Sequence, residues 1–182
     1  LDEFDSPKVL TFASAGWKRY YDFVNMDEVM KYADYTNVMT YDQVSGVSIY
    51  TGHHTPLGDV KTADIGGTSF QAHLDSLFAN GNSPDPDPRS AEKIVDFLIN
   101  SGVNPNQIVI GSAFYGRVWK GVPPVNNGLY QLSGGLQIGW MAYHQIREKY
   151  ESDSSFHRFW DEKAQAPFMY NFSDSLFVSY DD

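Results

Sequence analysis

Apolar residues in the first 117 positions alternate between short continuous runs and stripes with helical spacing. The continuous runs predict strands at residues 8–15, 36–41 and 107–115, and the stripes predict the helices between them. The third run is apolar on both faces, which is typical of a parallel strand buried between layers of helices. The alternation of strand and helix therefore predicts an α/β fold.

Capping signals mark the ends of the predicted helices. Asn25 precedes the first apolar stripe and is a suitable N-cap, and a short helix is expected over residues 70–78. The strongest helical pattern follows Asp87, which we expect to cap that helix, with Pro88 in its first turn. Gly102 is expected to end this helix in a left-handed conformation.

A polar, Gly-rich loop covers residues 42–67 and is far longer than the usual connection of about two to six residues. A loop of that length is expected to be functional or mobile. After residue 117 the pattern changes to short mixed segments, with a helix expected over 141–150.

Strands are expected to return at residues 168–171 and 176–180. We therefore predict barrel-type strands and helices over residues 1–117, an inserted α+β subdomain over 118–166 and a final barrel strand within 167–182. A complete eight-stranded barrel needs about 250 residues, so the 182 residues correspond to only part of one.

Composition narrows the possible partners. The net charge of −10 and the scatter of only 13 basic residues argue against a nucleic-acid surface. No apolar run is long enough to span a membrane, and without Cys there is no disulfide or thiolate site. Aromatic residues make up 15% of the chain, and they serve either as core or as platforms for sugar rings.

Reactive side chains follow three of the predicted strands, at residues 39–42, 114–117 and 169–171. Active sites of α/β barrels lie at these C-terminal strand ends. Tyr41, Asp42 and Arg117 offer a hydroxyl, a carboxylate and a guanidinium that suit a ligand with hydroxyl and amide groups. The alternative is that Asp42 and Arg117 form an ion pair at the rim while the tyrosines pack.

His53 and His54 do not predict a metal site. Neighbouring side chains on an extended segment point in opposite directions, and no third residue has the spacing of a ligand. The tripeptide at 171–173 fits the acceptor pattern for N-glycosylation, a pattern that is common by chance.

Seven short motifs in a fixed order resemble the family 18 glycoside hydrolases, the chitinases, from the fifth barrel strand to the eighth. They are FASAG (12–16), MTYD (39–42), GHHTPL (52–57), GSAFYGRVW (111–119), GLYQ (128–131), FWD (159–161) and APFMYN (166–171). The resemblance implies the second half of a (β/α)8 TIM barrel, with a small α+β insertion before its last strand.

The resemblance also implies hydrolysis of β-1,4-linked N-acetylglucosamine polymers without metal or cofactor. In that family the substrate's own acetamido oxygen attacks the anomeric carbon while a Glu protonates the leaving oxygen. Tyr41 resembles the tyrosine that orients the acetamido group, and Asp42 its sugar-contacting neighbour. The implied substrate-binding residues are Met39, Tyr115, Arg117 and Trp119, with core packing as the alternative for Trp119.

One part of the family pattern does not occur in these residues. The acidic motif Asp-x-x-Asp-x-Asp-x-Glu, which carries the general acid, is absent from the sequence. We therefore expect the acid upstream, an inactive fragment, and association with the other half of the barrel or with a second copy. A lectin-like protein that binds chitin oligosaccharides and an endo-β-N-acetylglucosaminidase are the alternative functions. The resemblance implies a secreted or extracellular protein.

Overall fold

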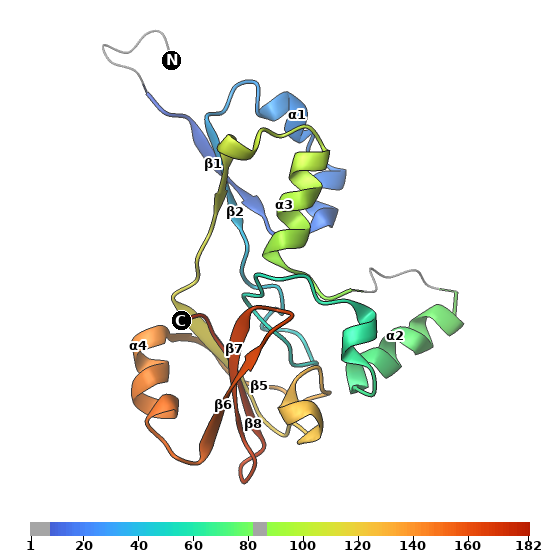
Figure 1. The fold of residues 1–182 in the computed structure, drawn as a ribbon, viewed down its shortest axis with the longest axis vertical. Helices are drawn as coiled ribbons and strands as arrows, with labels where there is room; N and C mark the ends of the chain where they lie inside the picture. Colours follow the sequence, from blue (N-terminus) through green and yellow to red (C-terminus); the bar gives the residue numbers. More distant parts are fainter. Residues whose placement is uncertain (1–7, 82–86) are drawn as a thin grey trace.

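The computed structural model describes residues 8–81 and 87–182, and these residues form two β-sheets (Figure 1). One sheet has three parallel strands in the order β1-β2-β3. The other has five antiparallel strands in the order β5-β4-β8-β7-β6. The described chain is thus a mixed α/β structure, in which the parallel sheet comes first in sequence.

The parallel sheet consists of β1 (Thr11–Ala15), β2 (Tyr35–Met39) and β3 (Ile108–Ile110). The helices that connect these strands are α1 (Met26–Val29), α2 (Ser69–Ala79) and α3 (Ala91–Asn100). α1 and α3 lie on the same side of the sheet in Figure 1. Their apolar side chains enclose Val38 of β2 in a common core that includes Met26, Met30, Ile94 and Leu98.

Two of the predicted helix ends are confirmed and one is wrong. The Asn25 side chain accepts a hydrogen bond from the Glu28 N–H, and Gly102 takes the expected positive φ of 95°. However, α3 begins three residues later than expected, and its cap is Ser90. Asp87 does not cap the helix because its Oδ1 accepts from the backbone N–H of Thr62 at 2.8 Å instead.

The expectation that the third strand is buried on both faces is also wrong. Val109 is 42% exposed and Ile110 is 50% exposed. Within the described residues β3 is an edge strand, so only its β2 side is paired. The strand ends at Ile110, and residues 111–114 lead away to the second sheet (Figure 1).

The antiparallel sheet extends beyond the expected boundaries of the insertion on both sides. Its strands are β4 (Tyr115–Trp119), β5 (Leu136–Ala142), β6 (Phe156–Asp161), β7 (Ala166–Asn171) and β8 (Leu176–Ser179). Residues 167–182, expected to hold a last barrel strand, instead form the β7–β8 hairpin of this sheet. An apolar run is common to any strand covered on both faces, so the pattern did not distinguish the two arrangements.

Both faces of this antiparallel sheet are covered. α4 (Tyr143–Ile146) and a π-helical turn, Arg147–Glu151, cover one face. The other face carries Trp119, Phe168, Tyr170 and Phe177, which pack against Ile65 and Leu74 from the segment that follows β2. Short 3-10 turns occur at Lys18–Asp22, Thr62–Ile65, Pro105–Gln107 and Val125–Gly128.

The long loop after β2 is fastened to this sheet along its length. The Thr51 N–H donates to the Gln131 carbonyl at 2.9 Å, and the Gly58 N–H donates to the Ala164 carbonyl at 2.8 Å. The His54 N–H donates to Ser179 Oγ at 2.8 Å. The loop therefore covers the core and connects the two sheets.

Candidate functional site

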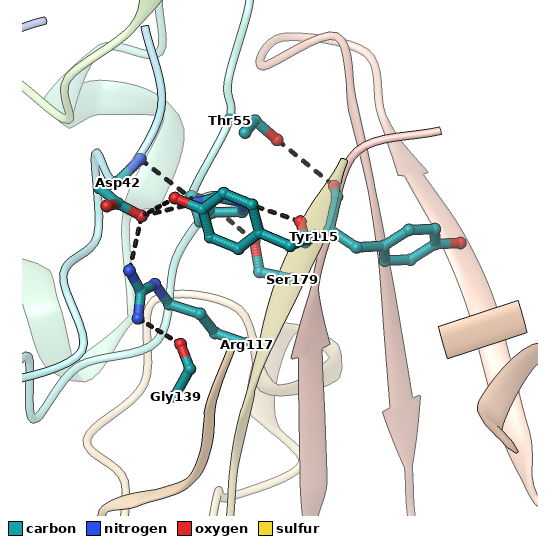
Figure 2. A network of polar contacts seen from close by, with 8 residues as sticks. Asp42, Thr55, Tyr115, Arg117, Gly139 and Ser179 are labelled. Atoms are coloured by element: carbon teal, nitrogen blue, oxygen red, sulfur yellow. Dashed lines mark hydrogen bonds and ion pairs between the residues drawn. The ribbon is translucent and has the colours of Figure 1, made fainter. Parts of the chain in front are cut away.

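Four side chains meet where the two sheets adjoin, and we call them the Asp42 cluster: Asp42, His54, Tyr115 and Arg117. Asp42 lies three residues beyond the end of β2, with an unusual positive φ of 57° that turns the chain. Its Oδ1 accepts a hydrogen bond from Tyr115 Oη at 2.7 Å and one from Arg117 Nη2 at 2.6 Å (Figure 2). The cluster thus joins the end of β2 to the start of β4.

The fully buried His54 connects the two halves of the cluster. Its Nε2 lies 3.0 Å from the Tyr115 carbonyl oxygen, which can only accept, so Nε2 carries a proton. Its Nδ1 lies 3.2 Å from the Asp42 N and 3.3 Å from Asp42 Oδ1. In a neutral imidazole, Nδ1 accepts a hydrogen bond from the Asp42 backbone N–H. In a charged imidazole, Nδ1 carries a proton and donates to the Asp42 carboxylate instead.

The cluster holds Asp42 in its ionised form. The His54 imidazole beside it lowers the pKa of Asp42 most, burial acts in the opposite direction, and the hydrogen bonds from Tyr115 and Arg117 lower the pKa further. The net pKa lies well below the usual range of a carboxyl group. Tyr115 and Arg117 donate in either state of His54, so Asp42 is an acceptor near neutral pH and cannot serve as a proton donor.

Tyr115 and Arg117 are held in place as donors. Burial, and then the hydrogen bond to Asp42, raise the pKa of Tyr115 above its usual value, so the phenol keeps its proton. Arg117 uses its second terminal nitrogen to donate to the carbonyl of Gly139 (Figure 2). This fork ties β4 to β5 as well as to Asp42, a geometry that a lysine cannot reproduce.

Aromatic rings lie beside the cluster. The Tyr41 ring meets the Tyr115 ring edge-on, with centroids 6.3 Å apart. Trp140 stacks on Tyr115 at 6.0 Å and is 62% exposed, which leaves much of its indole open to solvent. Trp140 is not among the residues predicted from the sequence, because a tryptophan within a strand carries no local signal of exposure.

The remaining predicted site residues are placed differently. Met39 is the partly buried last residue of β2. Trp119 is fully buried, packs on Phe177 at 6.1 Å and donates from Nε1 to the Ser48 carbonyl at 3.3 Å. Its expected substrate-binding role is therefore corrected to core packing, because a side chain without exposed surface cannot form the wall of a cleft.

The third predicted strand end, at residues 169–171, is buried in the core of the second sheet. Met169, Tyr170 and Asn171 have at most 1% of their surface exposed, so none of them lies in a cleft. The Asn171 amide donates to Ser155 Oγ and Asp174 Oδ2, and its oxygen accepts from the Ser173 N–H. These bonds hold the β7–β8 turn and bury the side-chain amide of Asn171, the acceptor group of the tripeptide.

The two neighbouring histidines have separate partners. His53 Nε2 lies 2.9 Å from Asp161 Oδ2 on β6, whereas His54 belongs to the Asp42 cluster. Over residues 8–81 and 87–182, no group of three or more His, Asp or Glu side chains is arranged to hold a metal ion. Over the same ranges no helix is long and apolar enough to cross a membrane.

Comparison with known proteins gives relatives along nearly the whole chain. Chitinase A1 of Niallia circulans is 28% identical over an alignment of 180 positions, which covers 96% of this chain and 24% of that protein. Chitinase B of Serratia marcescens is 28% identical over 208 residues, which cover 97% of this chain and 41% of that protein. The chain therefore spans less than half the length of these relatives.

Solved structures agree with these relatives. A family 18 N-acetylglucosaminidase from Paenibacillus barengoltzii superposes with a TM-score of 0.76 at 35% identity, over 96% of this chain and 44% of that one. The chain also matches the family described as glycosyl hydrolases family 18 over residues 2–182. The chain belongs to glycosyl hydrolases family 18.

Proposed function

We propose that this chain is the second half of a (β/α)8 barrel that hydrolyses β-1,4-linked N-acetylglucosamine polymers. The three parallel strands with helical connections support the barrel, and the antiparallel sheet between residues 115 and 179 is then its α+β insertion. The relatives named chitinases support the substrate. Because the chain spans only part of those relatives, the activity belongs to the larger assembly.

The observation that carries the proposal is the position of the Asp42 cluster. It follows the C-terminal end of a parallel strand, where α/β barrels place their active sites. We assign Tyr41 to the acetamido carbonyl of the bound sugar and Asp42 to a donor group on the same ring. Tyr115 and Arg117 hold the Asp42 carboxylate, and the exposed Trp140 offers a face for a neighbouring sugar.

The chemistry follows from the ionisation state of Asp42. Substrate-assisted retaining hydrolysis needs an acid to protonate the leaving oxygen, while the acetamido oxygen acts as the nucleophile. A carboxyl group with a strongly lowered pKa is deprotonated at neutral pH and cannot supply that proton. The acid is therefore assigned to a Glu upstream, and the 182 residues alone are expected to bind sugar without cleaving it.

The same cluster supports one neighbouring activity. The Paenibacillus barengoltzii enzyme, which is 35% identical to this chain, is an N-acetylglucosaminidase. In a non-hydrolytic, lectin-like protein the Asp42 cluster would bind the sugar in the same way, but no general acid would be present to protonate the glycosidic oxygen. A secreted location, and closure of the barrel by its other half or by a second copy, belong to the same proposal.

Titration with the N-acetylglucosamine trimer tests the assignment. Asp42→Ala is expected to weaken binding at least tenfold, because the acceptor for the sugar is lost. A tenfold change in affinity corresponds to about 1.4 kcal/mol of binding free energy. Asp96→Ala, which removes an exposed carboxylate from α3, is the matched control and should bind like the parent chain. Equal affinity of Asp42→Ala and the parent chain would refute the assignment.

A further inference from the structure

Two successive backbone N–H groups of the turn after β2 donate to the same residue, His54. The Asp42 N–H donates to His54 Nδ1 at 3.2 Å, and the Gln43 N–H donates to the His54 carbonyl at 3.0 Å. His54 is itself fixed from β8 and β4: its N–H donates to Ser179 Oγ at 2.8 Å, and its Nε2 lies 3.0 Å from the Tyr115 carbonyl oxygen. The fully buried His54 thus holds the turn at Asp42 against the antiparallel sheet.

The turn needs this support because Asp42 has a positive φ of 57°. Such a left-handed conformation is unfavourable for a residue with a side chain, and it persists only where neighbouring groups fix it. The backbone conformation also sets the direction of the Cα–Cβ bond. A turn that relaxed to negative φ would therefore direct the Asp42 carboxylate elsewhere.

This direction matters because one carboxylate oxygen is already in use. Tyr115 Oη, Arg117 Nη2 and His54 Nδ1 lie 2.7, 2.6 and 3.3 Å from the same atom, Oδ1 of Asp42. The Asp42 side chain is still 36% exposed. The three contacts at Oδ1 leave Oδ2 for a donor group of a sugar, and the turn decides where Oδ2 lies.

The two partners of the His54 ring define its protonation. The Tyr115 carbonyl can only accept, so Nε2 carries a proton, whereas the Asp42 N–H can only donate, so Nδ1 accepts. Both bonds form together only in the neutral imidazole. A proton on Nδ1 would leave the Asp42 N–H without its acceptor, and the Asp42 charge is already paired with Arg117 at 2.6 Å. Asp181, the other carboxyl group that acts on the ring, accepts from two backbone N–H groups.

We propose that His54 is a positioning residue of the sugar-binding site: its neutral imidazole accepts from the Asp42 N–H, holds the left-handed turn and so directs the Asp42 carboxylate toward the bound sugar. His54 does not touch the sugar, because its side chain has no exposed surface. The inference rests on the proposed function, since it takes Asp42 as the acceptor for a sugar group. It adds that the direction of this acceptor is set by a residue that follows it by 12 positions.

Two substitutions separate the two bonds of the ring. The amide oxygen of His54→Asn is as many bonds from Cα as Nδ1, so it can still accept from the Asp42 N–H. The amide nitrogen of His54→Gln is as many bonds from Cα as Nε2, so it can keep the bond to the Tyr115 carbonyl while the Asp42 N–H loses its acceptor. His144→Gln, at an exposed position of α4, is the matched control.

The measurement is a titration of each chain with the N-acetylglucosamine trimer, after its melting temperature shows that it is folded. We expect His54→Asn and His144→Gln to bind within about threefold of the parent chain and His54→Gln to bind at least about tenfold more weakly. In the Asp42→Ala background, His54→Gln should change the affinity less than about twofold, because a positioning residue acts through Asp42 alone. A residue that only stabilises the fold would weaken binding equally in both backgrounds.

Equal losses in His54→Asn and His54→Gln, or an undiminished loss in the Asp42→Ala background, would overturn the inference and leave the proposed function intact. If Asp42→Ala bound like the parent chain, the proposed function would fail and the inference with it. If a His54 variant does not fold, nitrogen NMR of the parent chain at neutral pH decides. An unprotonated Nδ1 with a protonated Nε2 supports the positioning role, and a proton on Nδ1 overturns it.

Discussion

Tyr115 Oη donates a hydrogen bond to Asp42 Oδ1 across 73 residues of sequence, and this bond joins the end of the parallel sheet to the start of the antiparallel one. Arg117 donates to the same oxygen from the same strand. The candidate substrate-binding carboxylate is thus also part of the joint between the two sheets. Changes at this joint should affect binding and stability together.

Tyr115→Phe removes one donor to Asp42 and keeps the ring stacked on Trp140 and edge-on to Tyr41. Since the pair is partly exposed, we expect a loss of about 1 kcal/mol in unfolding free energy and a weaker affinity for the N-acetylglucosamine trimer. Urea unfolding and titration of the same sample measure both effects. Tyr32→Phe, at a tyrosine that is 78% exposed, is the control and should change neither.

The lowered pKa of Asp42 gives a defined pH dependence. A carboxyl group whose pKa is depressed by folding stabilises the protein fully above its unfolded pKa of about 3.9, and this contribution is lost as pH falls through the lower folded value. The stability difference between the parent chain and Asp42→Asn should therefore be constant between about pH 5 and pH 8 and shrink below about pH 4. Urea unfolding across this range measures it.

A difference between Asp42→Asn and the parent chain that grew as the pH fell would contradict the assignment of Asp42 as a native-state carboxylate. Asp96→Asn controls for the loss of a surface charge at an exposed position of α3.

Gly16 is required by the close approach of the chain beyond β1. A Cβ at this position would lie 2.1 Å from the Met39 carbonyl oxygen and 2.6 Å from Gln43 Nε2. We expect Gly16→Ala to cost about 3 kcal/mol, because backbone has to move. Gly66→Ala is the matched control: its nearest neighbour would be 4.0 Å away, so its stability should stay within about 0.5 kcal/mol of the parent chain. Equal urea midpoints for the two variants would contradict this.

Much of the local structure could be predicted from the sequence. The Asn25 cap, the Gly102 stop and the strands at β1, β2, β7 and β8 follow from local patterns, and the structure contains each of them. The sheet to which β7 and β8 belong could not be predicted, because their apolar residues are as typical of a buried barrel strand as of a buried hairpin. The pairing that decides between the two depends on distant residues.

In the site, too, the residue types follow from local motifs, whereas the contacts between distant residues do not. Tyr41, Asp42, Tyr115 and Arg117 were recognised from motifs, and the structure brings the last three into direct contact. The ion pair of the alternative interpretation is confirmed, because Asp42 and Arg117 are bonded at 2.6 Å, whereas the substrate-binding role stays a prediction. The role of His54 could not be predicted, since its link between Asp42 N and the Tyr115 carbonyl depends on a fold that sequence spacing does not reveal.

The exposed edge of the parallel sheet predicts association. Val109 and Ile110 on β3 are exposed, and unpaired apolar edge strands promote pairing between chains. We expect light scattering to show particles larger than one 20.5 kDa chain, and we expect Ile110→Lys to reduce their size. A monodisperse monomer of the parent chain would contradict this prediction.

The most direct test of the account is to assay hydrolysis of a fluorogenic N-acetylglucosamine oligomer by this 182-residue chain while measuring binding of the unlabelled oligomer. The account predicts measurable binding, weakened by Asp42→Ala, and no turnover above the buffer rate. Clear turnover would contradict it, because a carboxyl group within these residues would then supply the proton that we assign to an upstream Glu.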